Sequence, residues 1–324
     1  MLELPNISVK DLQEWSKLGE VLTSGHRLCS GCGAGTMARQ VTIAAKALGD
    51  PIMIVNATGC LEVATTIYPY TAWNAPWLHN AFENASATAS GAIEAMKVMR
   101  RKQNKPDRNV NMIIFGGDGG TYDIGIQSLS GAIERGHDFL YVCYNNGAYM
   151  NTGIQRSGGT PMYAATTTSP AGKVIPGKVK WAKPLAEIIA AHEIPSFTAS
   201  PAYIRDLMAK VQAGLKHDGS AFLLVDSPCN LGQRYAPEIS IETTKIAVKS
   251  CFFPLYGTSE GEWILTGESA RIAKNPDRKV PVEDYFKLQG RFRHLFKPEW
   301  KKKLIEIQET VDERWERLVS LANI

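Results

Sequence analysis

Two stretches rich in glycine and asparagine could together bind a metal ion and a phosphorylated ligand. Residues 116–120 read Gly-Gly-Asp-Gly-Gly directly after the apolar run 110–115, and Asn145-Asn146 follow the apolar run 139–144. Glycines at a strand end let backbone N–H groups approach an anion closely. A hard cation such as Mg²⁺ takes oxygen ligands and often bridges to a diphosphate. We therefore expect three such oxygens, from Asp118, from the side chain of Asn146 and from a backbone carbonyl just beyond.

Four of the six cysteines fall in expected loops and could bind iron or zinc. Cys29 and Cys32 form a Cys-x-x-Cys pair, Cys60 follows a glycine and Cys229 follows a proline. Loop thiolates with nearby N–H donors suit an iron–sulfur cluster, but four thiolates could also bind zinc. Structural zinc usually uses two close pairs, and here only one pair is close. The spacing leaves three interpretations open: an iron–sulfur site, a zinc site, or unrelated core cysteines.

The elements that must position these residues alternate between strand and helix. Apolar runs at 51–56, 110–115 and 139–144 predict strands, residues 81–101 and 123–135 predict helices, and the stretches 185–191, 202–215 and 221–225 continue the alternation. Repeated strand–helix–strand units imply a mostly parallel sheet with helices on both faces. We expect this α/β fold, with ligands at the carboxyl ends of the strands.

Three stretches do not fit that alternation. Residues 57–80 and 145–178 predict long loops, and loops this long in a compact domain are usually functional. After residue 239 the pattern is irregular, and residues 299–321 predict an amphipathic helix that packs on the core or on a partner subunit. Cys143, inside an apolar run, and Cys251, before two phenylalanines, are expected to be buried small apolar side chains.

Composition limits the functional classes. The 324 residues carry a net charge of only +4 and no nucleic-acid-binding motif, so we expect no nucleic-acid partner. No apolar run approaches the roughly 20 residues that span a bilayer, and the first 22 residues do not resemble a signal peptide. We therefore place the protein in the cytoplasm without a membrane partner, where six cysteines favour metal or redox chemistry.

The Gly-Asp-Gly and Asn-Asn stretches resemble the motif of thiamine-diphosphate enzymes, with residues 120–144 between its halves. Over nearly the whole length, the chain resembles the β subunit of pyruvate:ferredoxin oxidoreductase (pyruvate synthase), in the 2-oxoacid:ferredoxin oxidoreductase family. The matching segments are residues 25–33, 57–63, 68–73, 79–84, 116–125, 149–157, 160–161, 166–170, 172–173 and 289–293. A match this long argues strongly against zinc.

The resemblance implies a role for each matching residue. Magnesium would be held by Asp118, Asn146 and the carbonyl of Ala148, and Asn151 would be the catalytic residue that contacts the substrate. The ligands of one [4Fe–4S] cluster near the thiamine would be Cys29, Cys32, Cys60 and Cys229. The residues expected to bind the cofactor are Gly59, Cys60, Gly117, Asp118, Gly119, Gly120, Asn146, Ala148 and Thr152.

The implied activity is the reversible, CoA-dependent oxidative decarboxylation of pyruvate to acetyl-CoA and CO₂, with electrons passing through the cluster to ferredoxin. The implied fold is a thiamine-diphosphate domain with cluster loops over residues 1–238 and a C-terminal extension over residues 239–324. The implied partners are an α subunit, whose pyrimidine-binding domain supplies the carboxylate that activates the thiamine, and γ and ferredoxin-like δ subunits or their fusions. We therefore expect this chain to be active only with partners.

Two departures from the family pattern leave the substrate open. The chain has Asn145-Asn146-Gly147 where the family commonly has Asp-Asn-Glu, and residues 230–235 are atypical. Oxalate or another 2-oxoacid remains an alternative substrate. Three alternatives lie outside the family activity, namely a non-oxidative thiamine decarboxylase or synthase, a non-enzymatic electron-carrier or scaffold subunit with a degenerate thiamine site, and a zinc-stabilised binding module.

Overall fold

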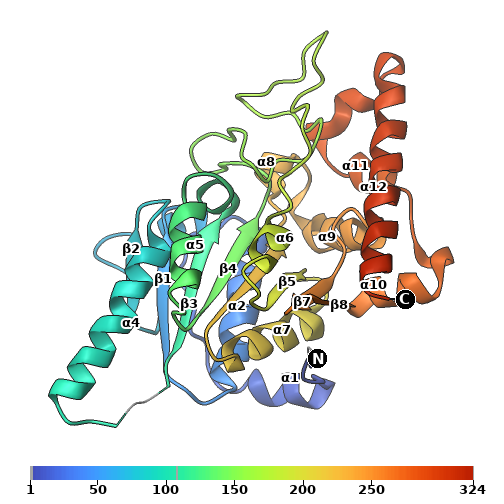
Figure 1. The fold of residues 1–324 in the computed structure, drawn as a ribbon. Helices are drawn as coiled ribbons and strands as arrows, with labels where there is room; N and C mark the ends of the chain where they lie inside the picture. Colours follow the sequence, from blue (N-terminus) through green and yellow to red (C-terminus); the bar gives the residue numbers. More distant parts are fainter. Residues whose placement is uncertain (1–2, 107–108, 324) are drawn as a thin grey trace.

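A single eight-stranded sheet forms the centre of the protein, which is described here by a computed structural model covering residues 3–106 and 109–323 (Figure 1). The strand order is β2-β1-β3-β4-β6-β5-β7-β8. The strands are β1 Ile52–Ala57, β2 Trp77–Asn80, β3 Asn111–Gly117, β4 Phe139–Asn145, β5 Ser196–Ala199, β6 Ser220–Asp226, β7 Tyr256–Ser259 and β8 Glu262–Leu265. The first six in this order run parallel, and β7 and β8 pair antiparallel at one edge.

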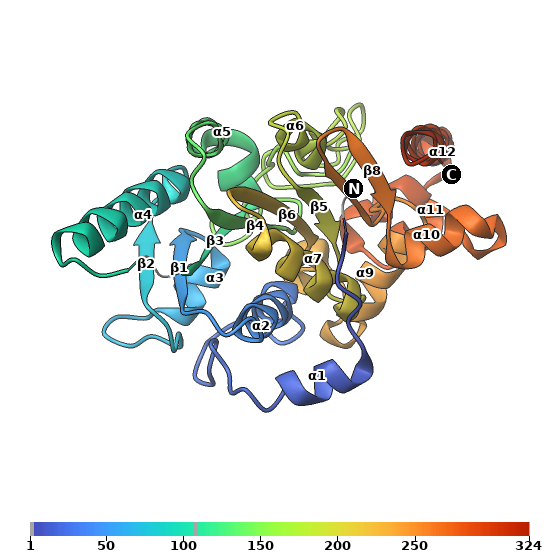
Figure 2. The ribbon, with the colours of Figure 1, turned by 60° about the horizontal axis from the view of Figure 1, so that its bottom comes forward.

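Helices cover both faces of the sheet (Figure 2). They are α1 Val9–Trp15, α2 Gly33–Lys46, α3 Cys60–Thr65, α4 Ala85–Lys102, α5 Ile126–Glu134, α6 Leu185–Ala190, α7 Ile204–Lys216, α8 Asn230–Gln233, α9 Ser240–Lys249, α10 Gly267–Lys274, α11 Val282–Lys287 and α12 Lys301–Leu321. One apolar core joins α1, α2, α3 and α7 to the sheet, and a second joins α4, α5, α6 and the C-terminal helices to it. Ile113 belongs to the first core and Ile114 to the second, as the alternation of side chains along a strand requires.

The central strands β3, β4 and β6 are buried along almost their whole length because both faces are covered. Their continuous apolar runs are what the sequence showed at 110–115, 139–144 and 221–225. The predicted α/β fold with a mostly parallel sheet is confirmed.

Several predicted bounds are wrong. Residues 57–80 are not one loop, because α3 begins at Cys60 and the edge strand β2 pairs with β1. The helix predicted from residue 81 begins only at Ala85. The helix predicted over 123–135 is split into a π-helix, Gly120–Ile124, followed by α5. Residues 145–178 contain no named helix or strand beyond the end of β4, as expected.

The C-terminal part is more regular than its sequence pattern indicated. The hairpin of β7 and β8 extends the sheet beyond β5, although the division of the chain at residue 239 stays a prediction. In α12 the buried side chains Ile307, Val311, Trp315 and Leu318 form one stripe, which confirms the predicted amphipathic helix. Within residues 3–106 and 109–323, no helix combines the length and apolar character that a membrane span requires.

Candidate cofactor site at the carboxyl ends of the strands

Four loops of the predicted site start from the same edge of the sheet. The strands β1, β3, β4 and β6 are parallel neighbours, so their carboxyl ends lie together. Asp118 directly follows β3 and Asn146 directly follows β4, while Cys60 and Cys229 lie three residues beyond β1 and β6. The topology thereby brings together residues that are far apart in the sequence.

The loops after β1, β3 and β4 line one pocket with an empty volume of about 340 Å³. Its lining contains all the residues predicted to bind the thiamine cofactor and magnesium, together with the predicted substrate contact. These residues are Gly59, Cys60, Gly117, Asp118, Gly119, Gly120, Asn146, Ala148, Asn151 and Thr152. The other five lining residues, to which the sequence assigned no role, are Thr58, Phe82, Tyr144, Tyr149 and Met150. Tyr144 directly precedes the Asn145-Asn146 motif, and the other four lie within matching segments.

Two glycines of the pocket are required by the close approach of aromatic rings. A Cβ atom at Gly59 would lie 2.4 Å from Tyr144 Oη, and one at Gly119 would lie 2.4 Å from the Tyr149 ring. Tyr149 Oη also donates a 2.7 Å hydrogen bond to the Gly119 carbonyl. These positions therefore form a backbone wall that side chains cannot fill.

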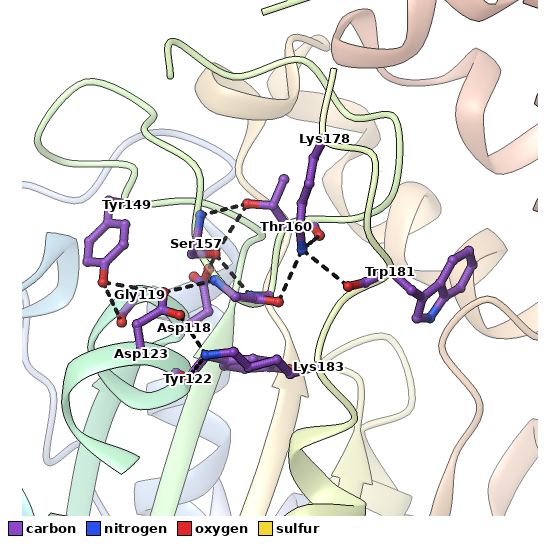
Figure 3. A network of polar contacts seen from close by, with 12 residues as sticks. Asp118, Gly119, Tyr122, Asp123, Tyr149, Ser157, Thr160, Lys178, Trp181 and Lys183 are labelled. Carbon is purple, nitrogen blue, oxygen red and sulfur yellow. Dashed lines mark hydrogen bonds and ion pairs between the residues drawn. The ribbon is translucent and has the colours of Figure 1, made fainter. Parts of the chain in front are cut away.

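Asp118 is a buried carboxyl group whose hydrogen-bond donors are neutral. Ser157 Oγ donates to Oδ2 (Figure 3). The Asn146 backbone N–H donates to Oδ1 at 3.4 Å. Burial raises the pKa of Asp118 to about 7, and these two hydrogen bonds act in the opposite direction. An ionised carboxylate at this depth would be stabilised by a bound cation.

The two asparagines after β4 have different surroundings. Asn145 Oδ1 accepts from the Gly147 N–H at 3.1 Å, and its Nδ2 donates to Tyr122 Oη at 3.2 Å. Asn146 instead lines the pocket beside Asp118, and its Oδ1 accepts only a long 3.4 Å bond from the Ala148 N–H. The amide oxygen of Asn146 is therefore the better placed of the two to bind a cation.

A polar network holds the loop that carries Ser157 (Figure 3). Asp123 accepts from the Gly158 N–H at 2.8 Å and pairs with Lys183 Nζ at 2.9 Å. The buried Lys178 donates to the Thr160 carbonyl at 2.5 Å and to the Gly158 carbonyl at 3.3 Å. None of these residues could be assigned a role from the sequence, because their hydrogen-bond partners lie on other segments.

Three of the four predicted cluster cysteines lie at helix starts. Cys32 is the N-cap of α2, Cys60 is the first residue of α3 and Cys229 is the N-cap of α8. The Sγ atom of Cys229 accepts from the Gly232 N–H at 3.5 Å. Helix N-termini favour negative charge.

The segment that carries Cys29 and Cys32 touches the segment that carries Cys229. The Gly33 N–H donates to the Pro228 carbonyl at 2.9 Å, and a Cβ atom at Gly33 would lie 2.3 Å from Pro228 Cδ. Burial raises the pKa of Cys60 to about 12, and the neighbouring Cys229, Cys32, Cys29 and Asp118 shift it in the same direction. Negative charge on the other three thiols or on Asp118 therefore disfavours ionisation of the Cys60 thiol.

Comparison with known proteins assigns the family. The sequence model for the C-terminal, TPP-binding domain of thiamine pyrophosphate enzymes matches residues 57–225. The pyruvate synthase subunit PorB of Thermotoga maritima is 48% identical over 322 residues, covering 98% of this chain and 97% of that protein. The chain belongs to the PorB family of pyruvate synthase subunits. This confirms the predicted family and the prediction of an enzyme subunit.

Two further sequence relatives and one solved structure are also similar to this chain. PorB of Methanocaldococcus jannaschii is 49% identical over 297 residues, covering 91% of this chain and 95% of that protein. The ketoisovalerate oxidoreductase subunit VorB of Pyrococcus abyssi is 39% identical over 304 residues, covering 93% of each chain. A structure of 2-oxoglutarate:ferredoxin oxidoreductase from Magnetococcus marinus shares the fold, with a TM-score of 0.52 at 21% identity, over 70% of this chain and 69% of that chain.

The residues of this PorB-family chain fit the thiamine cofactor and magnesium. The glycine wall leaves backbone groups open to a diphosphate, and Asp118 and Asn146 offer hard oxygen donors in the same pocket. The four cysteines, by contrast, do not form a binding site for a single metal ion. In the part of the chain that the structure describes, no three His, Cys, Asp or Glu side chains are grouped closely enough to hold a single metal ion.

The two remaining cysteines are as predicted for small apolar residues. Cys143, inside β4, is 0% exposed and Cys251 is 4% exposed. All six cysteines are free thiols. Cys29, Cys32 and Cys229 lie outside helices and strands as expected, whereas Cys60, which was also expected in a loop, is the first residue of α3.

Proposed function

We propose that this chain is the thiamine- and cluster-binding β subunit of a pyruvate synthase. The complex would catalyse the reversible, CoA-dependent oxidative decarboxylation of pyruvate to acetyl-CoA and CO₂. Electrons would leave through one [4Fe–4S] cluster in this chain and reach ferredoxin through a ferredoxin-like δ subunit, with α and γ subunits or their fusions completing the complex. The names of the PorB relatives support this proposal.

The observation that carries the proposal is that Cys60 and Asp118 line the same pocket. One is a proposed ligand of the cluster and the other a proposed ligand of the magnesium. Transfer of single electrons from a thiamine-bound substrate requires an acceptor close by. A pocket shared by both kinds of ligand meets that requirement.

The proposed roles in the pocket follow from the chemistry of each residue. Bound thiamine diphosphate supplies an electron sink that lets CO₂ leave. Asp118, Asn146 and the Ala148 carbonyl would hold the magnesium, and Gly117, Gly119 and Gly120 would offer backbone to the diphosphate. Asn151 and Thr152 are exposed residues of the lining, where an arriving substrate meets the protein first.

The proposed cluster does not need its ligands as close together as a single ion does. Thiolates around a four-iron cube sit at its corners, farther apart than four ligands of a single zinc. The cluster with its thiolates carries negative charge, which the helix starts at Cys32, Cys60 and Cys229 would stabilise. Reduced thiols of this kind persist in the cytoplasm, the location that we propose.

A second candidate is the same chemistry on another 2-oxoacid. The VorB relative, named for ketoisovalerate, is 39% identical, whereas the two PorB relatives are 48% and 49% identical. This difference favours pyruvate. A non-oxidative thiamine decarboxylase would need the pocket but not the four loop cysteines.

The decisive experiment is to purify the native complex without oxygen and to measure CoA-dependent reduction of a viologen dye. The substrate panel is pyruvate, 2-oxoisovalerate, 2-oxoglutarate and oxalate, and the matched control is the complex with Asp118→Ala. We expect pyruvate to give the highest kcat/KM and the control to lose thiamine and activity. Turnover with another acid but not pyruvate would refute the substrate, and a complex without thiamine or iron would refute the cofactors.

A further inference from the structure

We infer that Gln233 and Arg291 are positioning residues that hold the Asn146 loop in the shape that binds magnesium and the diphosphate. The inference deepens the proposed function and rests on it, because it concerns the same pocket. Neither residue lines that pocket, so both would act through the backbone of the loop.

Both side chains donate to the same backbone carbonyl. Gln233 Nε2 donates to the Asn146 carbonyl at 3.1 Å, and Arg291 Nη1 donates to it at 3.3 Å. Gln233 is 2% exposed and Arg291 is 3% exposed, so water does not compete freely for these bonds. Two donors on one oxygen fix the plane of the peptide between Asn146 and Gly147.

That peptide lies between the two proposed magnesium ligands of the loop and sets their relative orientation. The Asn146 side chain precedes it, and the Ala148 carbonyl lies one residue beyond it. Thr160 Oγ1 holds the next peptide by donating to the Gly147 carbonyl at 2.8 Å. A rotation of either peptide would turn the Ala148 carbonyl relative to the Asn146 side chain, so the two oxygens would no longer face one ion.

Arg291 is itself held in place. Its Nε donates to Gln289 Oε1 at 2.8 Å, and Gln289 Nε2 donates to the Tyr285 carbonyl at 3.1 Å. Its guanidinium carbon lies 5.1 Å from the centre of the Phe292 ring. Gly147 has a φ of +80°, and a Cβ atom there would lie 2.7 Å from Arg291 Nη1. Glycine at 147 therefore lets the arginine approach the loop.

Gln233 links the same peptide to the cysteine region. It is the last residue of α8, and its N–H donates to the carbonyl of the N-cap residue Cys229 at 2.9 Å. Cys229, a proposed cluster ligand, thus lies one helical turn before Gln233, whose side chain binds the proposed magnesium loop. Arg291 follows α11 in the C-terminal part of the chain. The Asn146 carbonyl is the point where both segments meet the loop after β4.

The test replaces Gln233 with methionine, whose side chain has a similar volume but no N–H donor. Gln212→Met is the matched control, because Gln212 is also buried and donates a 3.2 Å bond to a backbone carbonyl, that of Ala44, on α2. The assembled complex is stripped of thiamine diphosphate and Mg²⁺. Each ligand is then titrated back at a saturating concentration of the other, by calorimetry.

We expect Gln233→Met to raise the Kd for thiamine diphosphate and Mg²⁺ by about three- to tenfold, the effect of one buried hydrogen bond. Gln212→Met should leave both Kd values unchanged. Arg291→Met should have a larger effect than Gln233→Met, and Arg291→Lys should recover part of it. The amplitude of the cluster EPR signal should stay the same in Gln233→Met.

Each other outcome has a distinct meaning. A native complex that binds no thiamine diphosphate overturns the proposed function itself. A native complex that binds it, with Gln233→Met binding equally well, overturns only the positioning role. Equal weakening by Gln233→Met and Gln212→Met shows a general loss of packing and also overturns it. If Arg291→Met does not fold, Gln233→Met alone decides.

Discussion

At Asp118, burial and hydrogen bonding have opposite effects on one carboxyl group. Burial dominates, so the pKa rises to about 7 although Ser157 and the Asn146 N–H both stabilise the ionised form. The protein without metal therefore keeps this carboxyl protonated below about pH 7. A magnesium ion needs the ionised form, so the proton and the metal compete for the same side chain.

This competition predicts a pH dependence of metal binding. At saturating thiamine diphosphate, the affinity of the complex for Mg²⁺ should be level above pH 7 and fall by up to about tenfold for each pH unit below it. Calorimetric titration between pH 5.5 and 8.5 measures this. Asp118→Asn keeps the size of the side chain but cannot ionise, so it should bind Mg²⁺ more weakly and with a shallower slope. An equal slope in Asp118→Asn would contradict our assignment of the titrating group.

At the scale of single elements, the site is built from the starts of helices and the ends of strands. Cys32, Cys60 and Cys229 occupy helix starts, and the carboxyl ends of β3 and β4 carry Asp118 and Asn146. Helix starts favour negative charge, and the carboxyl ends of parallel strands bring their loops together at one edge of the sheet. The same elements therefore fix the geometry and supply part of the electrostatics.

The position of each cysteine in the helices and strands predicts whether its loss reduces the iron content. Cys60→Ala should abolish the brown absorbance and the reducible EPR signal of the complex, because it removes one of the four proposed ligands. Cys143→Ala is the matched control, since that thiol is buried within β4 and should retain all the iron. Iron analysis of anaerobically purified complexes measures both. Full iron content in Cys60→Ala would contradict the proposed ligand set.

The elements also show what the sequence could and could not predict. The long apolar runs of β3, β4 and β6 identified a parallel sheet because strands buried on both faces show no polar alternation. The edge strand β2 and the hairpin strands β7 and β8 each have four residues, which is too short to show the alternation of apolar and polar side chains. The motif residues were predictable from their types, whereas Gln233 acts through a backbone carbonyl that only the structure identifies.

At the scale of the whole molecule, we propose that the pocket needs a residue from a partner subunit to act as a catalyst. Asp118 is the only carboxylic acid among its lining residues, and we assign it to the metal. Thiamine chemistry also needs a carboxylate at the aminopyrimidine, which the family resemblance places in the α subunit. Strongly exposed apolar side chains, such as Tyr68 at 95% and Val174 at 86%, are consistent with surfaces that partners cover.

We therefore expect the isolated chain to bind iron but to show no 2-oxoacid-dependent dye reduction. Adding the α, γ and δ subunits under anaerobic conditions should restore turnover. The measurement is CoA-dependent viologen reduction by the chain alone and by the reconstituted complex. Robust turnover by the chain alone would show that this pocket needs no outside carboxylate.

The order of the cysteines along the chain has a consequence for biogenesis. Cys29, Cys32 and Cys60 are synthesised early, and Cys229 follows only after the last parallel strand, β6, is complete. A binding site that needs all four thiols is complete only once the ribosome has made most of the sheet. Iron insertion would then be a late step of maturation, and until that moment a nascent chain would carry its first three proposed ligand thiols without iron.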